Sequence, residues 1–154
     1  MKRLLMLLVA LLSGGIASNS LAQDGGNMEH THHNMQHSLS DNRISLNLSP
    51  ELKQHQLSNM RSHVEAVEAI TGLLAEGKFD QASQIAHSKL GLTDDMKKMC
   101  TMFENEKFNQ LGLAFHKSGD DLGDALKSKD MAKSLHALHD TMGYCVQCHA
   151  TFRQ

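Results

Sequence analysis

The segment "DMAKSLHALHDTMGYCVQCHATF", residues 130–152, has the pattern of one amphipathic helix. Its apolar side chains recur at alternating steps of three and four residues, together with a cysteine and a histidine, which places them all on one helix face. These residues are Leu135, Leu138, Met142, Cys145, His149 and Phe152. We therefore expect a long helix over residues 130–152 with this face turned toward a core.

An earlier segment, residues 49–76, shows the same period, with Ser49 as an N-cap and Pro50 in the first helical turn. Gly77 supplies the stop expected after a helix. The apolar face of this segment consists of Leu57, Met60, Val64, Val67, Thr71 and Leu74. We expect it to form the first helix of the domain.

Two further helices are predicted between these segments. One covers residues 79–90 and ends at Gly91. The other begins after Thr93, which suits an N-cap, and extends to about residue 128. Three glycines weaken this last segment, so a break inside it is expected as an alternative to one continuous helix; they are Gly112, Gly119 and Gly123.

Four amphipathic helices joined by short turns, with no strand signal, favour an all-α fold. The predicted architecture is an antiparallel up-down-up-down four-helix bundle over residues 48–154.

The N-terminal residues have a different character. Lys2 and Arg3 precede an apolar run over residues 4–12, and small residues follow as far as Ala22, so residues 1–22 have the pattern of a secretory signal peptide. No later stretch approaches the roughly 20 apolar residues of a membrane span. We expect an exported, periplasmic protein without a membrane span in its mature form.

After removal of Lys2 and Arg3, the remaining 13 basic residues face 17 acidic ones, a net charge of about -4. This balance gives no indication of a nucleic-acid partner. Residues 23–47 are polar and lack an apolar period, so we expect a flexible arm. Within it, imidazoles and thioethers suit copper, which makes a copper-binding arm an alternative to a plain polar tail; the residues are Met28, His30, His32, His33, Met35 and His37.

The strongest chemical signal is the C-x-x-C-H motif of Cys145, Cys148 and His149. On a helix, positions i, i+3 and i+4 project from one side. Two thiols there can bond the vinyl groups of one haem, and the adjacent imidazole can bind its iron. A thioredoxin-type motif would open a helix after a strand, and a zinc site would need a fourth ligand. A disulfide between the two cysteines also remains open.

The stretch "CVQCHATFR" at the end of the last predicted helix resembles the class II c-type cytochromes, the cytochrome c prime family. The resemblance covers about residues 48–154. It implies one covalent haem c, thioether bonds at Cys145 and Cys148, and His149 as the proximal iron ligand. It also implies that Arg153 packs beside the haem or its propionates. Homodimers are frequent in that family, and the sequence leaves the oligomeric state open.

The sixth iron position decides between two functions. Met60 lies roughly 16 Å into the first helix and Cys145 roughly 10 Å from the end of the last, which are similar levels. Some members of the family use a methionine of the first helix, so Met60 is the expected ligand. His63 is the second candidate. Met99 and Met102 are weaker ones, and an open site is the alternative.

A closed iron with His and Met ligands suits an electron carrier that serves periplasmic or membrane-bound redox partners. An open iron in an apolar pocket would bind NO or CO. No nucleophile and base constellation indicates an enzyme. We expect Cys100 to be a small buried apolar residue. Three histidines are expected toward the opposite end of the bundle, on the surface or in the core; they are His116, His136 and His139.

Overall fold

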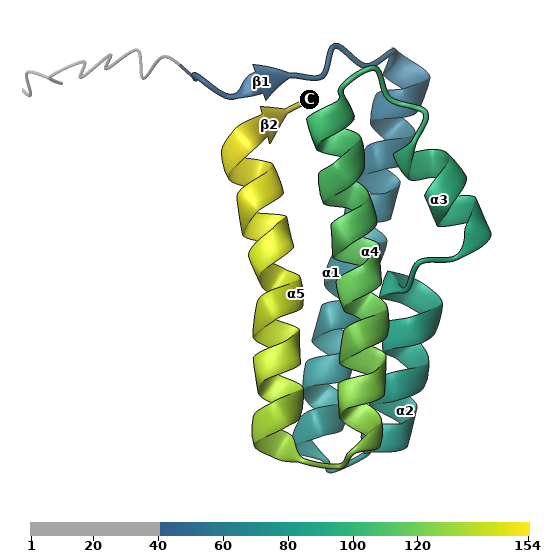
Figure 1. Cartoon of the computed structure of the whole chain (residues 1–154), viewed down its shortest axis with the longest axis vertical. Helices are drawn as coiled ribbons and strands as arrows, with labels where there is room; N and C mark the ends of the chain where they lie inside the picture. The colour runs from purple at the N-terminus through teal and green to yellow at the C-terminus, as the bar shows by residue number, and fades with distance from the viewer. Residues whose placement is uncertain (1–40) are drawn as a thin grey trace, which may run out of the picture. The chain divides into compact units, whose positions relative to one another are not determined.

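The computed structural model describes residues 41–154, so the predicted signal peptide and the part of the arm up to residue 40 lie outside the described residues. The described chain is predominantly helical, as predicted (Figure 1). Its elements are β1 (Ile44–Ser45), α1 (Pro50–Ala75), α2 (Phe79–Ile85), the π-helix η1 (Ala86–Leu90), α3 (Asp94–Cys100), α4 (Glu106–Lys127), α5 (Met131–Thr151) and β2 (Phe152–Arg153). Between residues 41 and 154, no helix is long and apolar enough to cross a membrane.

α1 begins where its predicted N-cap places it, and α5 begins at Met131, next to the predicted start at residue 130. Ser49 caps α1 through its hydroxyl, which accepts from the Leu52 N–H at 3.3 Å, and Pro50 follows in the first turn. Asp130 caps α5 by accepting from the Lys133 N–H at 3.0 Å. Gly77 has a φ of 71°, the left-handed conformation that ends a helix at low steric cost.

The segment 93–128 does break, but not at its glycines. α3 ends at Cys100, and the hydroxyl of Thr101 donates to the Lys97 carbonyl at 3.0 Å instead of continuing a regular turn. Asn105 then caps α4 by accepting from the Phe108 N–H at 3.0 Å. The predicted helix 79–90 also differs, because its last five residues form the π-helix η1.

The glycines of α4 serve close packing. A Cβ atom added to Gly119 would lie 2.4 Å from the Leu90 carbonyl oxygen, and one added to Gly123 would lie 2.4 Å from His87 Nε2. These positions allow α4 to approach η1 closely. His87 crosses to α4, where its Nδ1 lies 3.0 Å from Asp120 Oδ1.

Helices α1, α2, α4 and α5 run along the long axis, and the short helix α3 lies obliquely at one side (Figure 1). α4 packs against α5, α2, η1 and α3, while α1 packs against α2 and η1. α1 and α5 are not closely packed against each other. The fully buried core residues include Ile70, Leu90, Leu122 and Leu126. Ile70 lies toward the α1–α2 turn and Leu122 and Leu126 lie toward the α4–α5 turn, whereas Leu90 packs at Gly119 in the middle of α4.

The two short strands join the first and last described segments. β1 and β2 are parallel, with Ile44 opposite Phe152 and Ser45 opposite Arg153. The Leu46 N–H donates to the Arg153 carbonyl at 3.0 Å. Residues 44–46, which we expected in a flexible arm, are therefore hydrogen-bonded to the C-terminal end of the chain.

Candidate functional site

The helices α1, α3, α4 and α5 enclose a cavity of about 370 Å³. Its walls are almost entirely apolar, and they include no Asp, Glu, Lys or Arg. The residues of its walls that matter most here are Met60 and His63 of α1, Met96, Met99 and Cys100 of α3, Phe108, Phe115 and His116 of α4, and Cys145, Cys148 and His149 of α5. The structure thus brings together the predicted haem-attachment residues and the first candidate for the sixth ligand.

The α5 wall carries the C-x-x-C-H motif. Cys145 and Cys148 are half-buried and both are free thiols, so the disulfide alternative is not formed in this structure. Burial raises the pKa of Cys145, and burial together with the neighbouring Cys145 raises the pKa of Cys148 to about 11. His149 is exposed, and its carbonyl accepts from Arg43 Nη1 at 3.2 Å.

Two contacts between helices give their relative register. The Thr141 hydroxyl of α5 donates to the Ser118 carbonyl of α4 at 3.1 Å, and the His63 ring of α1 lies 4.8 Å from the Phe115 ring of α4. With a rise of about 1.5 Å per residue, Met60 is then level with about residue 147 of α5.

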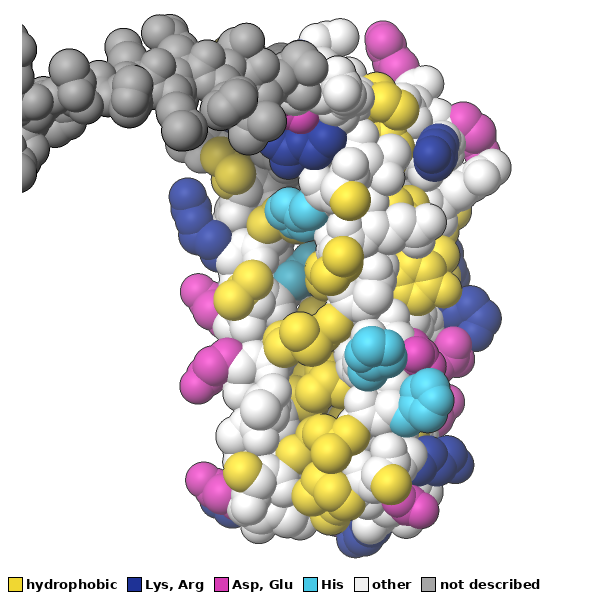
Figure 2. Space-filling model, turned by 90° about the vertical axis from the view of Figure 1, so that its left-hand side faces the viewer, with side chains coloured by type: hydrophobic (Ala, Val, Ile, Leu, Met, Phe, Trp, Pro, Cys, Tyr) yellow, Lys and Arg dark blue, Asp and Glu magenta, His cyan; other side chains and the backbone are white. Residues whose placement is uncertain are grey.

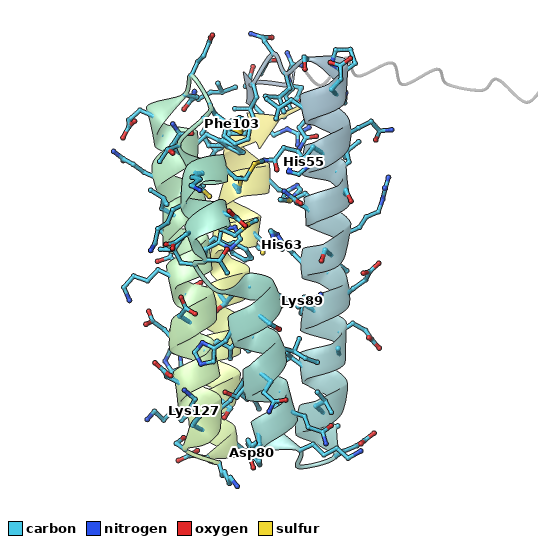
Figure 3. The ribbon with its side chains drawn as sticks, turned by 90° about the vertical axis from the view of Figure 1, so that its right-hand side faces the viewer. His55, His63, Asp80, Lys89, Phe103 and Lys127 are labelled. Atoms are coloured by element: carbon cyan, nitrogen blue, oxygen red, sulfur yellow. The ribbon has the colours of Figure 1, made fainter. Side chains whose placement is uncertain are left out.

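The register places the two candidate iron ligands of α1, Met60 and His63, at different levels along the axis. Met60 lies within about 3 Å of the level of Cys148 and His149 along the axis. His63 is level with about residue 144, roughly 8 Å from the level of His149. Figure 3 shows His63 projecting from α1 toward the helices opposite, and its ring contacts Phe115 of α4. Met99 also lines the cavity, whereas Met102 is 57% exposed and does not.

His116 is placed differently from our prediction. We expected it at the opposite end of the bundle, but it lines the cavity and is only 5% exposed. Its Nδ1 donates to the Leu90 carbonyl at 2.9 Å. Its spacing of four residues from Gly112 and eight from Phe108 is the sequence signal that could have placed it on this face. His136 and His139 are exposed and do not line the cavity.

Cys100 is buried as expected, but it belongs to the cavity wall rather than to the main core cluster. A Cβ atom added to Gly112 would lie 3.0 Å from its sulfur, so Cys100 packs against α4 at this glycine. Burial raises the pKa of its thiol. The cavity is therefore lined by three neutral thiols, of which the motif accounts for two.

Arg153 does not line the cavity. It is exposed in β2, and its Nε lies 3.9 Å from Asp41 Oδ2. Arg43 binds the same carboxylate through Nε at 2.9 Å and Nη2 at 2.8 Å. These hydrogen bonds from Arg43 lower the pKa of Asp41 to about 2. The basic residues beside the motif thus form a surface ion-pair cluster.

The cavity borders an exposed apolar face. Figure 2 shows apolar side chains gathered along the face formed by α1 and α5. Val64 and Val146 are each 69% exposed and Met142 is 44% exposed, and all three also line the cavity. Solvent-exposed apolar residues around an apolar cavity indicate a site that accepts an apolar or amphipathic group.

The donor set fits a haem. Two thiols and an imidazole project from one helix, and a thioether lies at their level on the opposite wall. Within residues 41–154, no group of three or more His, Cys, Asp or Glu side chains is arranged to hold a metal ion. No protein-family model, curated protein or solved structure matches the chain.

Proposed function

We propose that this chain is a periplasmic monohaem c-type cytochrome that transfers electrons, built as an up-down-up-down four-helix bundle like the class II family that it resembles. One observation carries the proposal: Cys145, Cys148 and His149 line the same apolar cavity as Met60. A covalent haem needs this combination of two thiols and an imidazole at C-x-x-C-H spacing.

Each residue has a distinct part. The Sγ atoms of Cys145 and Cys148 would bond the haem vinyl groups, and the imidazole of His149 would bind the iron. The bound haem would supply a one-electron redox centre. Arg43 orients the backbone at His149 through its hydrogen bond to the carbonyl. Arg153, in the exposed cluster near this end of α5, is proposed to lie beside the haem propionates.

Met60 is proposed as the sixth iron ligand. Its level on α1 matches that of the motif on α5, and an uncharged thioether suits an apolar wall. Iron held by His149 and Met60 would be closed to small molecules and would have a raised reduction potential. Such a centre suits electron exchange with periplasmic or membrane-bound redox proteins rather than catalysis.

The attachment is tested by expressing the full chain with the haem-attachment machinery and measuring the mass of the exported product. We expect the added mass of one haem in the wild type. Cys145→Ala and Cys148→Ala should each lose at least one thioether bond, which a reduced haem spectrum reports. Cys100→Ala is the matched control, because it removes a thiol of the same cavity outside the motif. An exported wild-type chain without added haem mass would refute the proposal.

The sixth ligand is tested on the ferric protein by absorbance and magnetic circular dichroism. We expect a methionine-to-iron charge-transfer band in the wild type, its loss in Met60→Ala, and its retention in Met99→Ala, which removes another methionine of the same cavity. A high-spin wild-type spectrum would instead assign an open iron and the binding of NO or CO. An unchanged spectrum in Met60→Ala would exclude Met60.

A further inference from the structure

The proposed haem site leaves two histidines of the cavity without a role. His63 of α1 and His116 of α4 have ring centres 5.3 Å apart and ring planes at 77°. Both line the cavity. By the helix register they lie about 5 Å or more along the axis from the level of Met60, toward the buried core. They therefore form a separate polar group at the inner end of the cavity.

The proton of His116 is fixed by its surroundings. A carbonyl only accepts, so Nδ1 must carry the proton that it donates to Leu90. Nε2 is then the unprotonated nitrogen, which is the form that can bind a metal. A buried imidazole whose one nitrogen is held by a backbone carbonyl and whose other nitrogen faces a cavity has the arrangement of a metal-ligating histidine.

The ring separation also suits a shared ion. With nitrogen to metal bonds of about 2.0 Å, each ring centre would lie about 3.2 Å from the ion. Two centres 5.3 Å apart then subtend an angle of about 110° at the ion, near the tetrahedral value. Among residues 41–154 the His63 ring has no hydrogen bond that would hold it in another orientation.

The charge of the surroundings selects the ion. Burial, with a smaller contribution from His116, lowers the pKa of His63 to about 4, and burial lowers the pKa of His116. Both rings are therefore neutral at pH 7 and able to bind a metal. No carboxylate lines the cavity to balance a divalent ion, and an unbalanced buried charge is costly. The carboxylate of Asp120 acts on His116 through its charge, but its oxygens are already hydrogen-bonded to His87 and to the Leu92 N–H. The donors that α3 contributes to the cavity wall are all soft sulfur atoms, the thioethers of Met96 and Met99 and the thiol of Cys100.

We propose that His63 and His116, completed by a thioether of α3, form a binding site for one Cu(I) ion at the inner end of the cavity. Neutral imidazole and thioether ligands suit a soft monovalent ion.

The test titrates Cu(I) into the full-length exported protein against bicinchoninate, with haem content measured separately by mass. We expect His63→Gln and His116→Gln each to lose one tightly bound copper relative to the wild type. His55→Gln is the matched control on α1, since His55 is exposed and lies outside the cavity. Copper held by the His- and Met-rich residues 28–37 is common to all four proteins and cancels in the comparison.

Far-UV circular dichroism checks that each variant is folded. If His116→Gln does not fold, His63→Gln alone decides the test, because His63 is less buried than His116. X-ray absorption at the copper edge should show imidazole and sulfur scattering in the wild type. Equal copper stoichiometry and affinity in the wild type and in His63→Gln would overturn the proposal. A wild type that carries copper but no haem would refute the cytochrome and leave this site standing.

Discussion

The substitution Gly119→Ala tests how closely α4 approaches η1. Alanine is favoured over glycine in a helix interior by about 1 kcal/mol, so helix propensity alone predicts stabilisation. The structure predicts the opposite sign. The new Cβ atom would lie 2.4 Å from the Leu90 carbonyl oxygen and 2.8 Å from Leu90 Cβ, which is closer than such atoms can approach. The backbone of η1 would have to move away.

Two unfavourable effects set the expected change in the free energy of unfolding of Gly119→Ala. Overpacking of a close contact costs about 1–3 kcal/mol. Movement of the Leu90 carbonyl would also weaken its hydrogen bond with His116, worth about 1 kcal/mol. After subtraction of the propensity gain, we expect a net loss of about 1–3 kcal/mol in the free energy of unfolding.

The assay is urea unfolding followed by far-UV circular dichroism, with the midpoint compared at an unchanged slope. Gly72→Ala is the matched control, because α1 offers open space around an added Cβ atom there. It should raise the free energy of unfolding by up to about 1 kcal/mol. If both alanines shift the midpoint upward by the same amount, the close approach of α4 and η1 is refuted.

Two other stability measurements follow from the burial of single side chains. Ile70 is fully buried in the core, so Ile70→Ala should lower the free energy of unfolding by about 2–5 kcal/mol, measured by the same urea titration. Burial holds the pKa of His63 at about 4, below its ordinary value of 6.5. The unfolded chain therefore gains this proton first, and copper-free protein should lose stability as the pH falls from about 6.5 to 4. Urea midpoints at pH 7 and pH 5 should differ less in His63→Gln than in the wild type, and an equal difference in both proteins would contradict this reasoning.

The features predicted correctly from the sequence are those with local causes. Ser49 and Thr93 are N-caps because a short side-chain oxygen can accept from an N–H three residues later. Gly77 ends α1 because a glycine adopts a positive φ at low cost. Likewise, Cys145, Cys148 and His149 face one cavity because their spacing within one helix fixes their side.

The features missed from the sequence depend on contacts between distant segments. Glycines weaken an isolated helix, so Gly119 and Gly123 suggested a break, but the approach of η1 requires small residues at these positions. The pairing of β1 with β2 joins residues more than 100 positions apart, and two-residue strands have no periodic pattern. The exposed position of Arg153 follows from this pairing, which no spacing around the motif reveals.

The residues at the inner end of the cavity show the same difference between features with local causes and features that depend on distant segments. The level of Met60 could be predicted because it is counted from the start of α1, as that of Cys145 is counted from the end of α5. His116 could not be placed in this way, because its predicted helix began at Thr93 and the break at residues 101–105 shifts its level. Counted from the true start of α4 at Glu106, His116 lies about 15 Å into the helix, near the level of His63. A break of five residues thus decides whether the cavity has one histidine or two at its inner end, and with it whether that end can bind a metal.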